Sequence, residues 1–508
     1  MKRVLNLTVA IFFVSLLSAQ NANDVLRLSQ NINSGTARYV SMGGAFGALG
    51  ADFTSLSNNP AGLGVYRSSE FTITPSLKHR ADETSYLGEI PYTDSRTRLL
   101  FDNIGIVTSF ISQNEEQKGL VMLNLGVGYN RINDFNSETS AMGANPTNSI
   151  MDYFAIKAYD NHWFDITSDE DYNPFRETNA PWDAILAWNN FLIDTLQGEH
   201  SEYVAALNSG EGVYQDQSIS SEGGVGEYTF SLAANLSNKF YFGATIGVQD
   251  VYYNETKYYT ESALEDNEAL PNGDKFENLN YNQTLTVDGS GVNFKLGAIF
   301  LPIPNLRLGL AAHTPTYYKL SENYRSSIES EFNVGTTSQS SPISLYDYKI
   351  ESPYKLIGSA AYTFGSMGLI SVDYEYVDYE TMRFGKGDDG YKFTNENTEI
   401  EQTFTNTFNL KTGGEVWIGQ LALRAGYAYY GSPYKSDVDM SSSSINVYSG
   451  GFGLKINDIF IDWAYQRYNF SDNYYLYPLR DEENPENDPI ANREVLQNKF
   501  VFTLGYKF

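Results

Sequence analysis

Apolar and polar residues alternate with a period of two along most of the chain, and the C-terminal end shows this clearly. From Phe500 to Phe508 every second residue is large and apolar, and the residues between are mostly small or polar. This is the period of a β-strand with one apolar face. The same pattern predicts fourteen strands, over residues 68–79, 98–112, 119–133, 226–236, 239–261, 277–300, 305–331, 343–364, 367–383, 399–417, 419–435, 441–456, 459–474 and 494–508.

The connections between these strands differ in length according to their position. Even-numbered strands are followed by short turns, such as 237–238 and 457–458, whereas odd-numbered strands are followed by longer polar segments, such as 134–225 and 475–493. Short turns on one side, long loops on the other and an even strand count are typical of outer-membrane barrels. The chain is therefore predicted to be all-β: a 14-stranded antiparallel transmembrane β-barrel over residues 67–508, with 134–225 as a large, partly helical extracellular loop.

Charged residues within the predicted strands indicate which face points inward. Asp373 and Glu375 alternate with apolar residues in the ninth strand, Asp462 does so in the thirteenth, and Arg424 lies between two apolar residues in the eleventh. Such side chains are tolerated in the lumen and not in lipid. Because a closed sheet leaves no edge, the last strand is expected to pair with the first and to turn its aromatic side to lipid. This terminal strand also resembles the signal that the barrel assembly machinery reads.

The N-terminus has the features of a secretory signal. Lys2 and Arg3 precede an apolar run and the small-residue stretch 18–20, so residues 1–20 are predicted to be a cleaved signal peptide. The chain has no cysteine, which excludes a lipid anchor and disulfides. A formal net charge of −28 argues against nucleic acid as a partner. An acidic secreted solenoid or sandwich fits the composition too, but gives no reason for the alternation of loop lengths.

Residues 21–66, between the signal and the first strand, are rich in small residues. Gly43, Gly44 and Ala45 begin a Gly/Ala cluster, and Asn59, Pro60 and Ala61 follow it. Small residues allow close packing, as in a plug inside a barrel. The alternative is a periplasmic tail with a few turns.

The stretch GTARYVSMGGAFGALGADFTSLSNNPAGL resembles the N-terminal hatch of the FadL-type family of outer-membrane transporters for long-chain fatty acids and hydrocarbons. The match falls on Gly43, Gly44, Ala45, Asp52 and the Asn59-Pro60-Ala61 triplet, and segment 291–320 resembles the family's mid-barrel hairpin. This resemblance implies fourteen strands, a hatch or gating role for these residues, and passive transport in the outer membrane of a Gram-negative bacterium. The implied partners are a hydrophobic small molecule, membrane lipid and lipopolysaccharide.

The family also implies lateral release of the ligand at an inward kink in the third strand. Gly126 and Gly128 lie in that strand here, and glycine permits bends. A second candidate site is the apolar stripe of segment 180–198, which includes Trp182, Ile185, Trp188 and Leu192 at largely helical spacing. It predicts a helix that either forms a capture groove for ligand or simply packs over the barrel mouth.

The sequence offers little sign of catalysis or of a cofactor. Its four histidines form no HExxH pair and no GxSxG motif is present, so neither a metal site nor a catalytic residue is expected. Acidic segments such as 388–389 and 480–488 favour a solvated rim over Ca²⁺ sites. Two alternatives remain beside transport. The first is a binding role, either as a haemin receptor that uses His162 or His200 or as a barrel that docks exported proteins through its large loop. The second is an acyl hydrolase.

Overall fold

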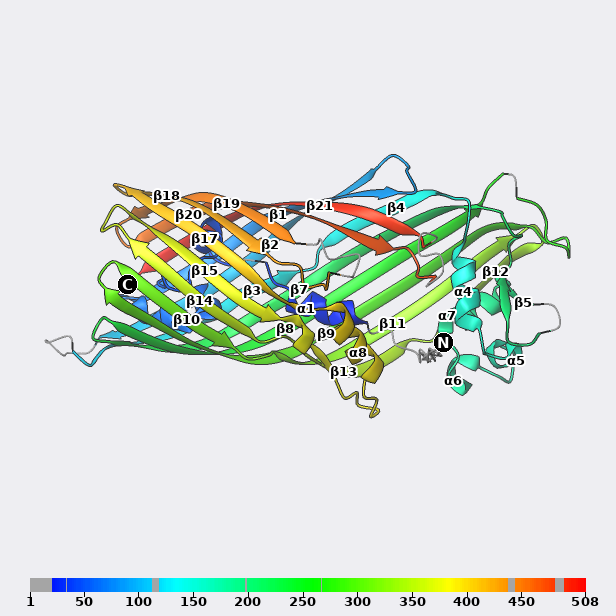
Figure 1. The fold of residues 1–508 in the computed structure, drawn as a ribbon, viewed down its shortest axis with the longest axis horizontal. Helices are drawn as coiled ribbons and strands as arrows, with labels where there is room; N and C mark the ends of the chain where they lie inside the picture. Colours follow the sequence, from blue (N-terminus) through cyan, green and yellow to red (C-terminus); the bar gives the residue numbers. More distant parts are fainter. Residues whose placement is uncertain are drawn as a thin grey trace, which may run out of the picture.

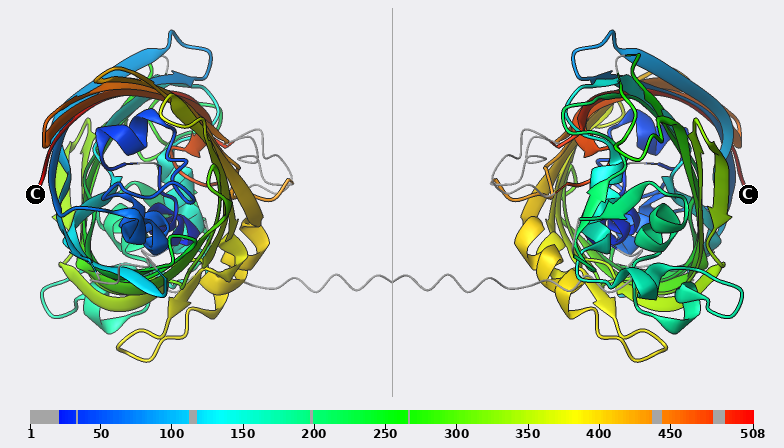
Figure 2. Two further views of the ribbon diagram at one scale, coloured as in Figure 1. Left: turned by 90° about the vertical axis from the view of Figure 1, so that its left-hand side faces the viewer. Right: turned by 90° about the vertical axis from the view of Figure 1, so that its right-hand side faces the viewer.

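The computed structural model describes residues 21–32, 34–111, 118–196, 199–265, 267–436, 444–479 and 488–508. The predicted signal peptide and most of the acidic segment 480–488 lie outside the described residues. The described part forms a closed antiparallel β-barrel (Figures 1 and 2). Its wall contains β1 (Glu70–Tyr86), β2 (Tyr92–Ile111), β3 (Leu120–Asp134), β7 (Val213–Leu236), β8 (Phe240–Ala263), β9 (Phe276–Ile303), β10 (Leu306–His313) with β11 (Tyr317–Phe332), β13 (Ser344–Glu351) with β14 (Lys355–Thr363), β15 (Gly368–Asp378) with β16 (Arg383–Gly385), β17 (Asn406–Ile418), β18 (Leu421–Tyr430), β19 (Ile445–Ile456), β20 (Ile459–Tyr475) and β21 (Ile490–Lys507).

The predicted number and order of the strands are confirmed. If β10 and β11, β13 and β14, and β15 and β16 each count as one interrupted strand, fourteen strands follow one another around the described barrel. The ring closes where β21 pairs with β1, from Glu70 opposite Lys507 to Tyr86 opposite Ala491. Short turns lie at one end of the barrel and longer connections at the other (Figure 1).

Several strand boundaries differ from the prediction. The first strand was predicted to end at residue 79 and the second to begin at residue 98, but β1 extends to Tyr86 and β2 begins at Tyr92. The tenth strand was predicted from residue 399, but β17 begins at Asn406 because α8 (Thr394–Thr403) precedes it. Glu396, Ile400 and Phe404 are all buried and lie four residues apart, which is helical spacing. The fourth strand was predicted from residue 226, but β7 begins at Val213, because its first half pairs with β8 and with β4 (Ser137–Asn145).

The two faces of the wall follow the predicted alternation. Phe500, Phe502, Leu504 and Tyr506 are exposed on the outside, whereas Val501 and Thr503 between them are buried. The charged residues Asp373, Glu375, Arg424 and Asp462 are all buried and face the interior. The barrel thus has an apolar outer belt and a polar lumen.

The described residues of segment 21–66, called the hatch segment below, lie inside this barrel (Figure 2). Four short helices make up about half of the segment in its described residues: α1 (Ala22–Ser29), α2 (Ala37–Ser41), α3 (Ser55–Asn58) and the 3₁₀ helix η1 (Pro60–Val65). Nearly every residue from Ala37 to Leu63 is buried. A 3₁₀ helix, η2 (Tyr379–Thr381), follows β15 and lies within the wall.

The long connection between β3 and β7 covers the end of the barrel opposite the short turns (Figure 1). It contains β4, α4 (Ile150–Ala158), α5 (Trp163–Ile166), α6 (Pro174–Glu177), α7 (Trp182–Asn189), β5 (Ile193–Thr195) and β6 (Tyr203–Ala205), and β12 (Gly335–Ser340) lies nearby. Its apolar side chains pack with Tyr281 and Ile328 of the wall. No helix in the described part of the chain has the length and apolar character needed to cross a bilayer.

Candidate functional site

The Asn59-Pro60-Ala61 triplet connects the hatch segment to the barrel wall. Asn59 is the N-cap of η1, and its Oδ1 accepts a hydrogen bond of 3.1 Å from the Ala61 N–H. Its Nδ2 donates to the Gly47 carbonyl at 2.5 Å and, more weakly, to the Ala298 carbonyl of β9 at 3.4 Å. Proline suits the first helical position because it has no N–H to satisfy there. The triplet therefore starts a helix and joins two parts of the hatch at the wall.

Gly43 and Gly44 allow the chain to reverse direction at the end of α2. Both have left-handed backbone angles, with φ of +63° and +75°, which glycine adopts at low cost. Glycines of the wall lie opposite the hatch, so that backbone meets backbone without side chains between. A Cβ would clash with the hatch at Gly243, Gly297, Gly309, Gly413 and Gly426.

Asp52 holds two turns of the hatch together. Its carboxylate accepts hydrogen bonds from the Thr36 hydroxyl at 2.7 and 2.8 Å and from the Thr54 N–H at 2.9 Å. Thr54 in turn accepts the Thr36 N–H through its hydroxyl at 2.9 Å. All three side chains are buried, so this cluster ties the start of α2 to the turn before α3.

A buried group of charges attaches the hatch to the opposite wall. Arg38 of α2 donates to both carboxylate oxygens of Glu415 on β17 at 3.1 Å. Glu415 also accepts from Arg424 of β18 at 2.6 Å, and Arg424 pairs with Asp462 of β20 at 2.5 Å. Two cations thus face two carboxylates, which offsets the cost of burying them.

Gly126 and Gly128 lie where β3 packs against the hatch. A Cβ at Gly126 would clash with Leu56, and one at Gly128 with Phe53. Both glycines are paired with β2 and with β7, and the irregularities of the β3–β7 ladder occur near Leu120 and near Arg131. Close packing therefore accounts for both glycines, and a kink at this point stays a prediction.

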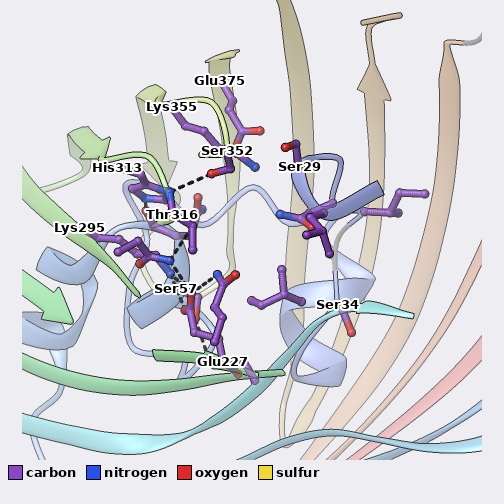
Figure 3. Close-up of a pocket in the computed structure, with 18 of the residues that line it drawn as sticks. Ser29, Ser34, Ser57, Glu227, Lys295, His313, Thr316, Ser352, Lys355 and Glu375 are labelled. Atoms are coloured by element: carbon purple, nitrogen blue, oxygen red, sulfur yellow. Dashed lines mark hydrogen bonds and ion pairs between the residues drawn. The ribbon is translucent and has the colours of Figure 1, made fainter. Parts of the chain in front are cut away.

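A polar pocket lies between the hatch and the wall (Figure 3). The hatch contributes Leu28, Ile32 and Ser57, and the wall contributes charged side chains from several strands. Glu227 of β7 pairs with Lys295 of β9, and Glu375 of β15 pairs with Lys411 of β17 at 3.2 Å. His313 of β10 donates its Nε2–H to the Asn58 carbonyl at 2.6 Å, so it joins the wall to the hatch.

Lys355 of β14 is the lysine of this pocket that forms no ion pair, and the carboxylate with which it interacts at longer range, Glu375, is shared with Lys411. Among the described residues no carboxylate lies within ion-pair distance of its ammonium group. Its side chain lines the pocket beside Glu375, which already pairs with Lys411 (Figure 3). A cation without a partner in a confined site is costly unless a ligand supplies the negative charge. The pocket is therefore suited to an anionic group.

The predicted apolar stripe of the loop is buried. The helix α7 ends at Asn189, earlier than the predicted segment, and β5 follows it. Ile185 and Leu192 are fully buried, and Trp182 and Trp188 pack against the same cluster with wall residues. Of the two alternatives, packing over the barrel mouth describes this structure. Ligand capture by these residues would require the cluster to open, and that role stays a prediction.

His162 and His200 lie side by side on the exposed part of the loop, with ring centroids 5.3 Å apart. The Nδ1 of His162 accepts the Phe164 N–H at 3.2 Å and so caps α5. In the described residues no three His, Asp or Glu side chains are grouped so as to hold a metal ion.

Sequence reasoning missed the residues of the pocket. Glu227, Lys295, His313 and Lys355 are inward-facing polar positions in predicted strands, and the alternation that located Glu375 applies to them as well. Which of these side chains meet depends on how the strands are staggered, and a slip of one residue reverses every face. The sequence thus shows that each of these charged residues faces inward, but it does not show which side chains lie beside it.

No protein-family model and no curated protein sequence matches this chain. Solved structures do match. The crystal structure of a Pseudomonas aeruginosa FadL homologue superposes with a TM-score of 0.55 at 12% sequence identity, over 94% of this chain and 100% of that chain. The toluene transporter TodX of P. putida superposes with a TM-score of 0.50 at 12% identity, over 94% and 99% of the two chains. At such identities the likeness establishes the fold, and the expected FadL-type, 14-stranded barrel is confirmed.

Proposed function

We propose that this protein is a passive outer-membrane channel for hydrophobic small molecules, either long-chain fatty acids or hydrocarbons. The observation that supports this most is a partly open pocket between the hatch segment and the barrel wall. A lumen filled by the hatch prevents free flow of water and solutes. Uptake then requires capture of the ligand, rearrangement of the hatch and release into the membrane. Transport of toluene by TodX, which shares the fold, agrees with such a role.

The proposed location is the outer membrane of a Gram-negative bacterium. The predicted signal peptide supports export, and the apolar outer face of the closed barrel supports insertion among lipids and lipopolysaccharide. The C-terminal strand is proposed to be read by the assembly machinery, since it closes the ring and ends in aromatic residues. In this arrangement residues 21–66 act as the hatch and residues 134–225 as the main extracellular loop.

Of the two ligand classes, the pocket favours an amphiphile with an anionic head. Lys355 offers a positive charge that is only partly compensated, because Glu375 pairs with Lys411, and Thr316 and Ser352 place hydroxyl groups nearby (Figure 3). Apolar side chains of the same pocket, including Leu28, Ile32 and Ile132, provide a surface for an acyl chain. A carboxylate would supply the missing charge and a hydrocarbon would not.

The first experiment is equilibrium binding of labelled oleate to the detergent-purified protein, with toluene and haemin as competitors. Saturable oleate binding that toluene displaces and haemin does not is the expected result. Haemin binding without oleate binding would support the haemin-receptor alternative and contradict the proposal.

A Lys355→Met variant is expected to bind oleate about tenfold more weakly or worse, since a hydrogen bond to a charged group contributes about 1.5–3 kcal/mol. Toluene binding should be unchanged, because toluene has no charge to pair. Lys349→Met is the matched control, since Lys349 is an exposed lysine in the adjacent β13. The dissociation constants of both ligands are measured for the three proteins. Equal weakening of oleate and toluene binding would contradict a head-group role.

An Asn59→Ala variant is expected to slow oleate uptake without unfolding the barrel. The change removes the cap of η1 and the bond to Gly47, and loss of an N-cap costs about 1 kcal/mol. The strand ladders are untouched. Uptake of labelled oleate by cells and the heat-induced gel shift of the purified barrel give the two readouts, with Asn23→Ala of α1 as control. Unchanged uptake would remove the triplet from the mechanism.

A further inference from the structure

Two lysines face each other on the outer surface of the barrel. Lys319 of β11 is paired directly with Lys349 of β13, and both side chains are exposed. Each alternates with buried neighbours, Leu320 and Ile350, so both point away from the lumen. In the described part of the chain neither ammonium group forms an ion pair. Like charges directly opposite each other on adjacent strands destabilise a sheet, so this arrangement favours a bound anion.

Small residues beside the two lysines keep them accessible. Ser290 of β9 is paired with Lys319, and Gly385 of β16 is paired with Lys349. A serine and a glycine leave both ammonium groups open to the surroundings, and the serine hydroxyl can donate a further hydrogen bond. These four residues form a row across the wall, called the lysine row below. The lysine row presents donors to an anion without a bulky side chain in the way.

The carboxylates of this outer face lie in the neighbouring rows. Asp288 and Asp347 are paired with Ser321 in the row beyond, and the Ser321 hydroxyl donates to Asp347 at 2.6 Å. Glu351 lies in the row on the other side, opposite Tyr317. These carboxylates lower the net charge of the surface. The lysine row itself carries only positive charge, so a phosphate that enters it meets two cations.

The lysine row lies just beyond the apolar outer belt of the barrel. In the next row toward the belt, Val292 and Tyr317 are paired and are 40% and 55% exposed. Phe294 and Leu296 follow on the outer face of β9. Aromatic residues of this kind mark the membrane interface in transmembrane barrels. The lysines are therefore at the depth of lipid head groups, on the side of the barrel with the long connections (Figure 1).

An apolar groove lies on the same outer face, within the belt. Small residues, among them Ala312 and Gly358, line part of it. A Cβ placed at Gly358 would meet no atom within 4 Å, so this glycine leaves room on the surface. The groove has a volume of about 540 Å³, and its larger lining residues are Leu296 of β9, Leu310 of β10, Leu356 of β14 and Tyr374 of β15. Its size and apolar lining suit a hydrocarbon chain.

The groove and the lysine row are one lipid length apart on the same two strands, because β11 continues β10 and β13 precedes β14. Lys319 follows Ala312 by seven positions, which is at most about 23 Å along an extended chain. A membrane leaflet with its head groups is about 20–22 Å deep. Barrel strands are tilted, so the difference in depth is smaller than the length along the strand. A lipid with its phosphate at the lysines can therefore place an acyl chain in the groove.

We propose that this outer face binds lipopolysaccharide, with a phosphate of its lipid A between Lys319 and Lys349 and an acyl chain in the groove. The inference rests on the proposed outer-membrane location and is independent of the transported ligand. Lipopolysaccharide fits because it is the lipid of the outer leaflet and combines phosphates with several acyl chains. Contacts between ammonium and phosphate groups are charge-assisted and stronger than neutral hydrogen bonds. The site faces the membrane, whereas Lys355 lines the pocket in the lumen, so the two do not share a ligand.

Binding of fluorescent diphosphoryl lipid A to the detergent-purified full chain tests this site, with phosphatidylglycerol and dephosphorylated lipid A as comparison lipids. The first variant combines Lys319→Met with Lys349→Met. Its matched control combines Lys239→Met with Lys455→Met, which replaces two exposed lysines next to short turns at the opposite end of the barrel. The second variant, Gly358→Leu, fills the groove with a side chain whose Cβ meets no atom of the protein.

The wild type is expected to bind diphosphoryl lipid A more tightly than either comparison lipid. The double lysine variant should bind it about tenfold more weakly and bind dephosphorylated lipid A as before, because only the phosphate contacts are lost. Gly358→Leu should weaken binding of both forms of lipid A by the same factor, and the control should change neither. Unchanged lipid A binding by the lysine variant, or phosphatidylglycerol binding as tight as that of lipid A, would overturn the inference. Oleate binding is measured on the same proteins, and its absence in the wild type would overturn the transport proposal and leave the lipid site standing.

Discussion

A Glu415→Gln variant is expected to release the hatch segment from the wall while the barrel stays closed. Glu415 is 1% exposed and is the carboxylate that receives both Arg38 of the hatch and Arg424 of the wall. The amide keeps the shape of the side chain and loses its charge. Removing one partner from a buried ion pair typically costs about 3–5 kcal/mol, since the remaining charges stay buried without compensation.

This cost should appear mainly at the hatch. Arg424 keeps its bond to Asp462, and the ladders of β17 and β18 are unchanged, whereas Arg38 loses its charged partner and keeps its 3.2 Å bond to the Ala51 carbonyl. Limited trypsin digestion measures the effect, because Arg27 and Arg38 become cleavable once the hatch leaves the lumen. The temperature at which the β-sheet signal is lost, followed by circular dichroism, reports on the barrel.

A matched control comes from the surface of the same side of the barrel. Glu401 pairs with Arg383 at 3.0 Å, but about half of each side chain is exposed. Glu401→Gln should leave both the digestion pattern and the unfolding temperature unchanged, since exposed pairs contribute little. Protection of the hatch in Glu415→Gln equal to that in the wild type would show that these charges do not hold it.

The strands could be predicted because their signal is local and repeated. Each strand of the wall has one face toward lipid or solvent and one toward the lumen, so period-two alternation persists over many residues, as in β21. The end of the chain confirms this: β21 is paired with β20 on one side and, apart from a gap opposite Thr74 and Pro75, with β1 on the other. α8 was misread because a short polar helix with few apolar residues gives a weak periodic signal.

The site was less predictable because its parts come from distant strands. The hatch triplet could be recognised from its residues, and its cap geometry agrees with the Asn-Pro order. The break between β10 and β11, at Pro315, lies opposite the break between β13 and β14, at Pro353, and the separation of these residues in sequence does not reveal that. Only the observed pairing of His313 with Lys355 and of Tyr317 with Glu351 aligns the two breaks. Likewise, Lys355 forms no ion pair because Glu375 pairs with Lys411, and the sequence does not reveal this.

The closing strand is expected to tolerate a charge poorly on its outer face. Leu504 lies in the middle of the exposed apolar run from Phe500 to Phe508, is 42% exposed and is paired with Ile73 of β1 and Ile461 of β20. An arginine on the lipid face costs about 2–4 kcal/mol near the bilayer midplane and about 0–1 near its surfaces. Leu504→Arg should therefore lower the free energy of unfolding of the barrel by about 2–4 kcal/mol and reduce the yield of assembled protein.

The matched control is Asn492→Arg, which lies on the same strand and the same face, twelve residues earlier. Asn492 is paired with Ser85 and Asn473, so its surroundings are already polar, and the added charge should have little effect. Urea titration of the protein in lipid vesicles gives the free energy of unfolding of each variant. A large loss of stability confined to Leu504→Arg would show that this outer face of β21 lies in lipid. Equal stability of the two variants would mean that this face of the barrel does not lie in lipid, and would contradict the proposed outer-membrane location.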